Sequence, residues 1–300
     1  MEGSIRCQEL ESKHPKHNCC HVTLPLPDFS GSAEDDQFRS RFIQCLLHQP
    51  PPQWPTQIGE EPIPRVLVQY WHDLNHVPDD VQECLNSWES LRNHGFRRLI
   101  FDDERARSFI SKHFSAEHVE AFDLCYHPAM RCDYFRLCYI FRYGGFYVDA
   151  DEVYQDTGCE AFFNDNKLKI RPLCYDTATD AMVRNEIFLK DTSYPSSRIF
   201  YVANDPIIGP AGHELIRLAI ERSTRILLLR SERPEIQSTT GPGNLSASLV
   251  NHAIRTKLAC REWDFLILPN WRYTSVCQWS LSYRNDERNW RFLNTPRFTR

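Results

Sequence analysis

The chain has 300 residues, of which 41% are hydrophobic and 25% are charged, a composition typical of a globular protein with a buried core. Its formal net charge of -5 argues against binding of nucleic acid, because phosphate backbones are held by concentrated lysine and arginine. No apolar run reaches the roughly 18 residues that span a bilayer, so we predict no transmembrane segment. The 12 cysteines lack a recurring spacing and the N-terminus lacks a signal-peptide pattern, which favours a reducing, cytoplasmic location. A peripheral Golgi protein or a secreted effector would have the same features.

Residues 1–60 are polar and rich in proline, and we predict that they form an irregular N-terminal extension with hydrophobic periodicity only around Phe38 to Leu47. Within it lies a cluster of metal-ligand residue types: His14, His17, Cys19, Cys20 and His21. Their spacing is not the paired spacing of a zinc site, so the cluster indicates a disordered tail. The main domain is predicted over 61–282, followed by a polar C-terminal arm over 283–300.

From residue 61 onward, β-rich runs alternate with helical patterns. Strands are predicted at 65–70, 97–101, 146–148, 168–174, 198–202 and 265–268. Helices are predicted at 79–93, within 102–126, and at 128–143, 213–230 and 245–260. This alternation predicts an α/β fold with a mostly parallel central sheet that helices cover on both faces. In such sheets, ligands bind at the carboxyl ends of the strands.

Two aspartates follow the strand that ends at Val148. In an extended chain successive side chains alternate, so Asp149 and Asp151 would lie on one side of the backbone and Glu152 on the other. Two neighbouring carboxylates repel each other unless a cation lies between them, and hard oxygen ligands suit Mn²⁺ or Mg²⁺. The segment therefore predicts a divalent-metal site that can hold the negative charge of a diphosphate.

Asp133 and Arg136 share one face of the predicted helix 128–143, among apolar neighbours. Burying an unpaired charge costs several kcal/mol, so both residues need a partner or a function. They can neutralise each other as an internal ion pair. They can equally line a pocket, in which the aspartate accepts hydrogen bonds from sugar hydroxyls and the arginine binds phosphate. The residues alone leave both interpretations open.

These motifs occur together in a specific order. The chain reads I-P-R-V-L-V-Q-Y-W from Ile63, then D-x-x-R and G-G-x-Y-x-D-x-D up to Asp151, and later T-G-P-G-N-L from Thr240. This order resembles the family 32 glycosyltransferases with a DXD motif, which include yeast-type mannosyltransferases and galactosyltransferases and are similar in this region to the clostridial glucosylating toxins. The resemblance covers about 63–153 and, more weakly, 239–250.

The resemblance implies a GT-A type nucleotide-diphospho-sugar transferase fold, a divalent cation and retention of the anomeric configuration. It implies that Asp149 and Asp151 bind the metal and the diphosphate, and that Asp133 and Arg136 are catalytic and contact the donor. The implied donor-binding residues are Trp71, Asp133, Arg136, Gly144, Gly145 and Asp149. Trp71 resembles an aromatic residue that stacks on the nucleobase, although a core tryptophan would fit the same pattern. The two glycines would form a tight turn in which backbone segments approach closely.

Some positions depart from the family pattern. Val68 stands where a histidine is usual in the first strand, and Ala150 stands between the metal aspartates where a larger residue is usual. His213 matches a histidine that is often seen in family members, and it is equally suited to cap a helix. The turn at 240–243 is expected to shape the floor of the active site.

The function implied by the resemblance is transfer of a sugar from a UDP- or GDP-sugar to an acceptor hydroxyl on a glycan, a protein or a small natural product. One alternative is a phosphatase of the haloacid-dehalogenase type with Asp149 as nucleophile, because 146–153 also satisfies that strand signature. That signature usually opens its domain, whereas about 80 residues of α/β pattern precede it here. The other alternative is a non-catalytic relative that binds a sugar nucleotide.

Overall fold

The structure is a computed structural model of the chain and describes residues 33–48, 62–193, 195–229, 233–259 and 261–293. Six strands form a central sheet in the order β10-β5-β9-β3-β1-β2. They are β1 (Val66–Tyr70), β2 (Arg97–Phe101), β3 (Gly145–Tyr147), β5 (Leu168–Ile170), β9 (Ile207–Gly209) and β10 (Phe265–Ile267). β2 and β3 pair parallel with β1, and β10 pairs parallel with β5, whereas β9 runs antiparallel to both β3 and β5. All strands except β9 therefore point the same way.

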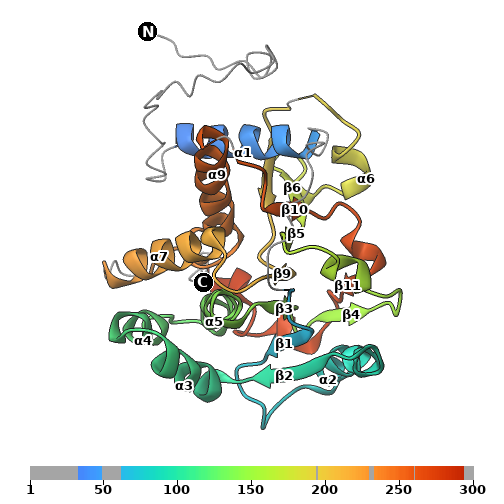
Figure 1. Ribbon diagram of the computed structural model, residues 1–300, viewed down its shortest axis with the longest axis vertical. Coiled ribbons are helices and arrows are strands. Elements are labelled where there is room, and N and C mark those ends of the chain that lie inside the picture. The colour runs from blue at the N-terminus through green and yellow to red at the C-terminus, as the bar shows by residue number, and fades with distance from the viewer. Residues whose placement is uncertain (1–32, 49–61, 194, 230–232, 260, 294–300) are drawn as a thin grey trace, which may run out of the picture.

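Helices cover this sheet on both sides (Figure 1). The helices are α1 (Ala33–His48), α2 (Asp79–Ser87), α3 (Asp103–His113), α4 (Ala116–Asp123), α5 (Pro128–Tyr143), α6 (Asn185–Phe188), α7 (Glu214–Leu228), α8 (Ile236–Thr239) and α9 (Pro242–Leu258). In Figure 1, α3, α4, α5, α7 and α9 lie on one side of the strands, and α2 lies on the other. The α/β fold with a mostly parallel sheet between helices is thus confirmed.

Two smaller sheets extend the central one. β4 (Glu152–Tyr154) pairs antiparallel with β11 (Ser275–Cys277). β6 (Pro172–Asp176) pairs antiparallel with β7 (Ala181–Met182) and with β8 (Arg198–Val202). Short 3-10 helices complete the fold: η2 (Trp88–His94), η3 (Glu160–Phe163), η4 (Trp271–Tyr273), η5 (Ser282–Asn285) and η6 (Trp290–Leu293).

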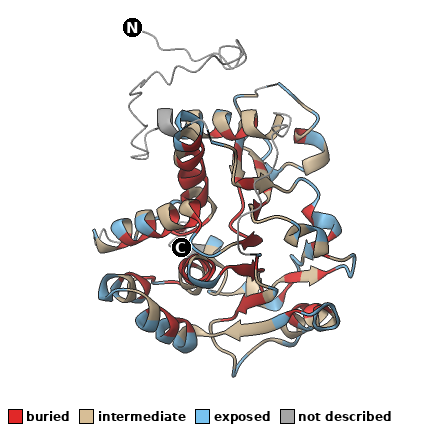
Figure 2. Ribbon diagram, viewed as in Figure 1, coloured by how far each residue is buried: buried red, intermediate tan, exposed pale blue. Residues whose placement is uncertain are grey.

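Helix α5 is the central buried helix, as the mostly red ribbon in Figure 2 shows. It begins at Pro128, which is favoured in the first turn because it has no backbone N–H to satisfy there, and His127 accepts a hydrogen bond from the Ala129 N–H as its N-cap. It ends at Gly144, which has a positive φ of 67°. Apolar residues surround the helix, and the charged pair Asp133 and Arg136 is buried with them. The sheet and its helices therefore place both charges in the interior.

The chain termini differ from the sequence prediction. Within the extension expected to be irregular, 33–48 form α1, which contacts β8 and α9 and places Ile43 in the core. The hydrophobic periodicity around Phe38 is the signal of this helix. The His14 to His21 cluster lies outside the described residues. At the other end, residues 282–285 and 290–293 form η5 and η6, and η5 contacts the predicted site.

No helix within the described ranges is both long enough and apolar enough to cross a bilayer.

Candidate functional site

The topology brings two predicted residues and two further charged residues to one edge of the central sheet. Trp71 follows the carboxyl end of β1, Asp149 comes shortly after β3, and Arg171 follows β5. Asp205 precedes the amino end of β9, which lies at the same edge because β9 runs antiparallel. This is the edge at which ligands bind in α/β proteins.

The DXD segment is a turn. The Glu152 N–H donates to the Asp149 carbonyl oxygen at 3.3 Å, and the chain then continues as β4. The extended geometry predicted for 149–151 is therefore wrong, because the backbone reverses between β3 and β4 instead of continuing the strand. Glu152 is fully buried and accepts hydrogen bonds from Arg171 and Ser275. Arg171 also contacts Asp205, so Glu152 belongs to the charge network around the DXD turn.

Arg136 is the centre of the site. Its Nη2 atom lies 3.0 Å from Asp133 Oδ1 and 2.8 Å from Asp149 Oδ1, and its Nη1 donates to the Asn204 carbonyl oxygen at 2.8 Å. The guanidinium also lies over the Tyr147 ring, 4.4 Å from its centroid. Its side chain is only 3% exposed. The structure therefore contains the internal ion pair with Asp133 and also joins that pair to the DXD motif.

The Asp133 carboxylate, which pairs with Arg136, is also held by two neighbouring side chains. The Asn204 amide donates to its Oδ1 at 2.8 Å, and the Thr240 hydroxyl donates to its Oδ2 at 3.4 Å. Burial raises the pKa of Asp133 to about 6, although Arg136 lowers it. A Cβ atom on Gly241 would lie 3.4 Å from the same carboxylate, so the turn at 240–243 packs directly against this carboxylate.

Several residues of the cluster were not predicted from the sequence, among them Tyr147, Asn204 and Asp205. Tyr147 donates to Asp149 Oδ1 at 3.1 Å, and Asp205 Oδ1 accepts from the Asp149 N–H at 2.7 Å. Burial raises the pKa of Asp205 well above its usual value, and the neighbouring Asp149 adds to this effect. Tyr147 lies inside the quoted motif and could have been found by its alternation with Asp149. Nothing near Asn204 and Asp205 in the sequence marks them, since their role arises from the pairing of β9 with β3.

Asp151 lies on the C-terminal side of the cluster. Its carboxylate accepts a hydrogen bond from the Tyr283 hydroxyl at 2.8 Å and forms an ion pair with Arg284. Burial raises the pKa of Asp151 to about 6, Asp149 raises it further, and Arg284 lowers it. Two residues of the predicted polar arm are thus bound to a predicted metal ligand.

Trp71 is 7% exposed and packs with Ala150 and Leu281 in a small apolar cluster. Its indole N–H points to the His76 carbonyl oxygen at 3.4 Å, and the Tyr283 ring meets it edge-on at 5.3 Å. Trp71 is therefore a buried tryptophan that lies close to the DXD turn, and its stacking on a nucleobase stays a prediction.

Gly144 and Gly145 form the predicted tight turn, but at the opposite end of β3 from Asp149. A Cβ atom on Gly144 would lie 2.7 Å from the Ala211 nitrogen, and one on Gly145 would lie 2.9 Å from the Val66 carbonyl oxygen. The backbone that approaches these glycines closely belongs to the protein itself. The structure does not bring them to the Asp149 cluster.

His213, His252 and Asp264 form a second group with metal-ligand residue types, whose ligand atoms all lie within 4.8 Å of one another. They lie near the edge of the sheet opposite to Asp149, because His213 follows β9 and Asp264 precedes β10. His213 Nδ1 accepts from the Leu215 N–H as the N-cap of α7, so its Nε2 carries the hydrogen and donates to the Asp264 carbonyl oxygen at 3.0 Å. The predicted capping role of His213 is confirmed, and with both nitrogens engaged the residue lacks a free ligand atom.

Protonation of His213 is expected to destabilise the fold. Burial lowers its pKa below the usual value of about 6.5, although Asp264 and Glu214 raise it and His252 lowers it further. Because the folded-state pKa is lowered, its contribution is fully present above pH ~6.5 and is lost as the pH falls below that value. We expect His213→Asn, which retains a capping side chain, to show a smaller fall in the free energy of unfolding between pH 7 and 5. Urea denaturation of both proteins at the two pH values tests this, and equal falls would contradict it.

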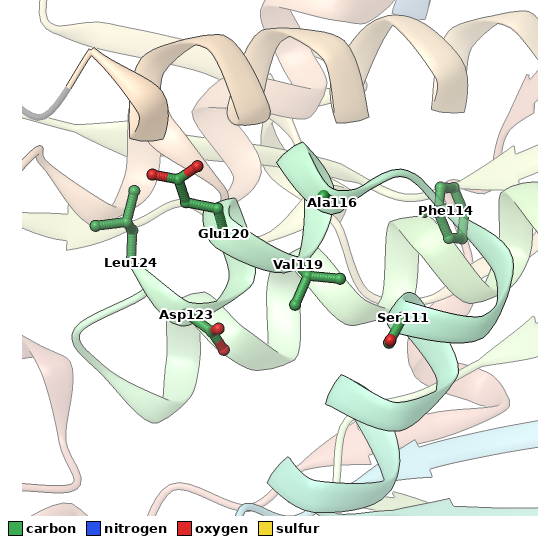
Figure 3. Close-up of a pocket in the computed structure, with 7 residues that line it drawn as sticks. All are labelled: Ser111, Phe114, Ala116, Val119, Glu120, Asp123 and Leu124. Atoms are coloured by element: carbon green, nitrogen blue, oxygen red, sulfur yellow. The ribbon is translucent and has the colours of Figure 1, made fainter.

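A surface pocket lies between the end of α3 and α4 (Figure 3). It is lined by Ser111, Phe114, Ala116, Val119, Glu120, Asp123 and Leu124. None of the predicted site residues lines it, so the geometry of the Asp149 cluster does not depend on this pocket.

Part of the chain, including the DXD turn, is similar to known proteins. Residues 78–167 match the family described as a glycosyltransferase sugar-binding region containing the DXD motif. The matched region contains Asp133, Arg136, Asp149 and Asp151, so the resemblance to DXD glycosyltransferases stated from the sequence is confirmed.

An uncharacterized glycosyltransferase of Acanthamoeba polyphaga mimivirus is 27% identical to the chain over 113 residues, which are 36% of this chain and 45% of the relative. The chain thus spans less than half the length of that curated relative. Among solved structures, the PaToxG glycosyltransferase aligns with a TM-score of 0.41 and 11% identity, over 74% of this chain and 82% of that chain.

Proposed function

We propose that the chain is a retaining, divalent-metal-dependent glycosyltransferase that moves a sugar from a UDP- or GDP-sugar to an acceptor hydroxyl. The observation that carries this proposal is the position of Arg136, whose guanidinium lies within 3.0 Å of both Asp133 and Asp149 at the carboxyl edge of the sheet. The guanidinium is only 3% exposed and joins the buried Asp133 to Asp149, whose side chain is 31% exposed, so the pair extends from the interior toward the surface. Such an arrangement suits a site that binds an anionic ligand.

The described residues fit a divalent cation by their charge and their donor atoms. Five carboxyl groups surround the DXD turn, together with three guanidinium groups: Asp133, Asp149, Asp151, Glu152 and Asp205, with Arg136, Arg171 and Arg284. If all are ionised, a divalent cation balances the remaining charge. The donor atoms are carboxylate oxygens, which Mn²⁺ and Mg²⁺ prefer. Asp149 and Asp151 would hold the ion.

The site also has unused donors for an anion. Among the described residues, the Nε atoms of Arg136 and Arg284 are buried and have no hydrogen-bond partner. Buried guanidinium N–H groups without partners are uncommon, and phosphate oxygens would satisfy them. These donors fit the diphosphate of a nucleotide sugar.

The mechanism assigns roles to Asp133 and Arg136 beside the cation. A bound cation would stabilise the charge that grows on the leaving diphosphate. Arg136 binds the diphosphate and keeps Asp149 in place, and Asp133 accepts hydrogen bonds from the donor sugar. The acceptor hydroxyl attacks from the side on which the nucleotide leaves, so the anomeric configuration is retained without an enzyme nucleophile. The acceptor is a glycan, a protein or a small natural product.

Replacement of Asp149 or Asp151 by asparagine tests this function. We expect each variant to hydrolyse UDP- and GDP-sugars about 100-fold more slowly in the presence of Mn²⁺, because each loses one charged ligand oxygen. Asp156→Asn is the matched control, since Asp156 is an exposed acid directly after β4. Initial rates over a panel of donors measure the effect.

The same assay separates the alternatives. Unchanged hydrolysis by both variants would overturn the assignment. Hydrolysis of simple phosphate esters that is lost in Asp149→Asn would favour the phosphatase. Binding of sugar nucleotides without turnover over a panel of donors and acceptors would favour the non-catalytic relative.

A further inference from the structure

The C-terminal segment 281–284 covers the DXD turn. Arg284 pairs with Asp151, and the two side chains are only 12% and 16% exposed. The Tyr283 hydroxyl donates to the same oxygen, Asp151 Oδ2, at 2.8 Å. Both contacts use the carboxylate that the proposed function assigns to the cation.

The same segment also covers Trp71. The Tyr283 ring lies 5.3 Å from the Trp71 ring at an interplanar angle of 78°, and Leu281 packs in the Trp71 cluster. Ser282 fixes the segment to α2, since its N–H and hydroxyl both donate to the Asp80 carboxylate. These four consecutive residues thus contact one predicted donor-binding residue, Trp71, one predicted metal ligand, Asp151, and helix α2.

We propose that Arg284 and Tyr283 form a latch on Asp151 that a divalent cation must displace, so that segment 281–284 sets the cation affinity of the site and access to Trp71. This inference rests on the proposed function. Arg284 and a metal ion compete for the negative charge of one carboxylate, and Arg284 and Tyr283 already occupy its Oδ2 atom. When the cation binds, Arg284 and Tyr283 lose their contacts with Asp151.

The latch predicts a specific change in cation affinity. If the latched form dominates without cation, the apparent affinity for Mn²⁺ is reduced by the small fraction of unlatched molecules. Arg284→Gln removes the competing charge while it preserves much of the side-chain length. We expect this variant to bind Mn²⁺ about tenfold more tightly than the wild type.

Electron paramagnetic resonance of free Mn²⁺ during titration of the full chain measures this affinity without any substrate. Arg288→Gln is the matched control, because Arg288 is an arginine four positions after Arg284 in the sequence and pairs with Asp286 at 2.6 Å rather than with Asp151. It removes the same charge from the same region and is expected to change the affinity less than twofold. Arg284→Lys keeps the charge, and we expect its Mn²⁺ affinity to be closer to that of the wild type than the affinity of Arg284→Gln is.

The outcomes separate the latch from the proposed function. Equal Mn²⁺ affinity of the wild type and Arg284→Gln, with binding lost in Asp151→Asn, would overturn the latch and leave the cation site intact. Absence of Mn²⁺ binding in every protein would overturn the cation site itself. An equal gain in Mn²⁺ affinity in Arg284→Gln and Arg288→Gln would also overturn the latch. It would show that the loss of any nearby positive charge raises the affinity.

A second measurement uses only the wild type and does not depend on the folding of a variant. We expect Mn²⁺ to speed amide hydrogen exchange in 281–284, because displacement of Arg284 and Tyr283 frees the segment. Exchange in the core helix α5 should not rise. Unchanged or slower exchange of 281–284 with Mn²⁺ would contradict release of the latch.

Discussion

Replacement of Arg136 by methionine is expected to reduce sugar-nucleotide turnover about 1,000-fold and to lower the free energy of unfolding by about 3–5 kcal/mol. The catalytic loss follows from the removal of the donor that contacts both Asp133 and Asp149. The loss of stability follows because two carboxylates in a largely buried site lose their main cation. Asp133 is the more affected, since burial already raises its pKa.

Arg98→Met is the matched control for this prediction. Arg98 has a side chain that is 5% exposed, donates to Gln69 at 2.8 Å and pairs with Glu89, but it lies in β2 away from the DXD turn. We expect Arg98→Met to destabilise the fold and to leave turnover of the folded protein within about threefold of the wild type. Urea denaturation gives the stabilities, and initial rates below the unfolding transition give the turnover.

Two further results would bear on Arg136. Turnover of Arg136→Met within about tenfold of the wild type would contradict its role in binding the diphosphate. Arg136→Lys is expected to recover only part of the loss, because an ammonium group cannot bridge two carboxylates and a carbonyl oxygen with the planar geometry of a guanidinium.

Much of the fold could be predicted because the signals are local. Helix α5 was predicted with the bounds that the structure shows, since proline at its start and glycine after its end are themselves the boundary signals. The strands around Leu67 and Leu99 were predicted within one residue, because their β-rich runs are short and bounded. Such features depend on neighbouring residues only.

The parts that could not be predicted depend on contacts between distant segments. β9 has three residues and follows Asp205 and Pro206, so its sequence does not show that it pairs with β3. This pairing alone places Asn204 beside Arg136 and Asp205 beside the Asp149 N–H. The contact between Arg284 and Asp151 joins residues 133 positions apart and has no local signal either.

The DXD turn shows how an argument with the wrong geometry can still place two residues in the same cluster. Asp149 and Asp151 were placed together by the alternation of an extended strand, yet the strand ends at Tyr147 and a turn follows. Both carboxylates remain in one cluster because Asp205 holds the Asp149 backbone and Tyr283 holds the Asp151 side chain. Period-two reasoning therefore found the residues but not the contacts that fix them.

Gly144→Ala is expected to lower the free energy of unfolding by about 3 kcal/mol or more. Gly144 has φ 67° and ψ -169°, a conformation that residues with a Cβ atom avoid. The added methyl group would also lie 2.7 Å from the Ala211 nitrogen and 2.8 Å from the Gly209 carbonyl oxygen. Both are backbone atoms in or shortly after β9, which pairs with β3, so a shift of either atom would disturb this pairing.

Gly95→Ala separates conformational strain from this close contact. Gly95 has a similar φ of 79°, but a Cβ atom there would meet no atom within 4 Å, so we expect a cost of only about 1 kcal/mol. Urea denaturation of both variants gives the two costs. If Gly144 contacts the donor, as the family resemblance implies, Gly144→Ala should also raise the KM for the sugar nucleotide in the protein that remains folded. Because Gly144 lies at the far end of β3 from Asp149, we expect this KM to stay within about twofold of the wild-type value. A larger increase would support the assignment of Gly144 to the donor site.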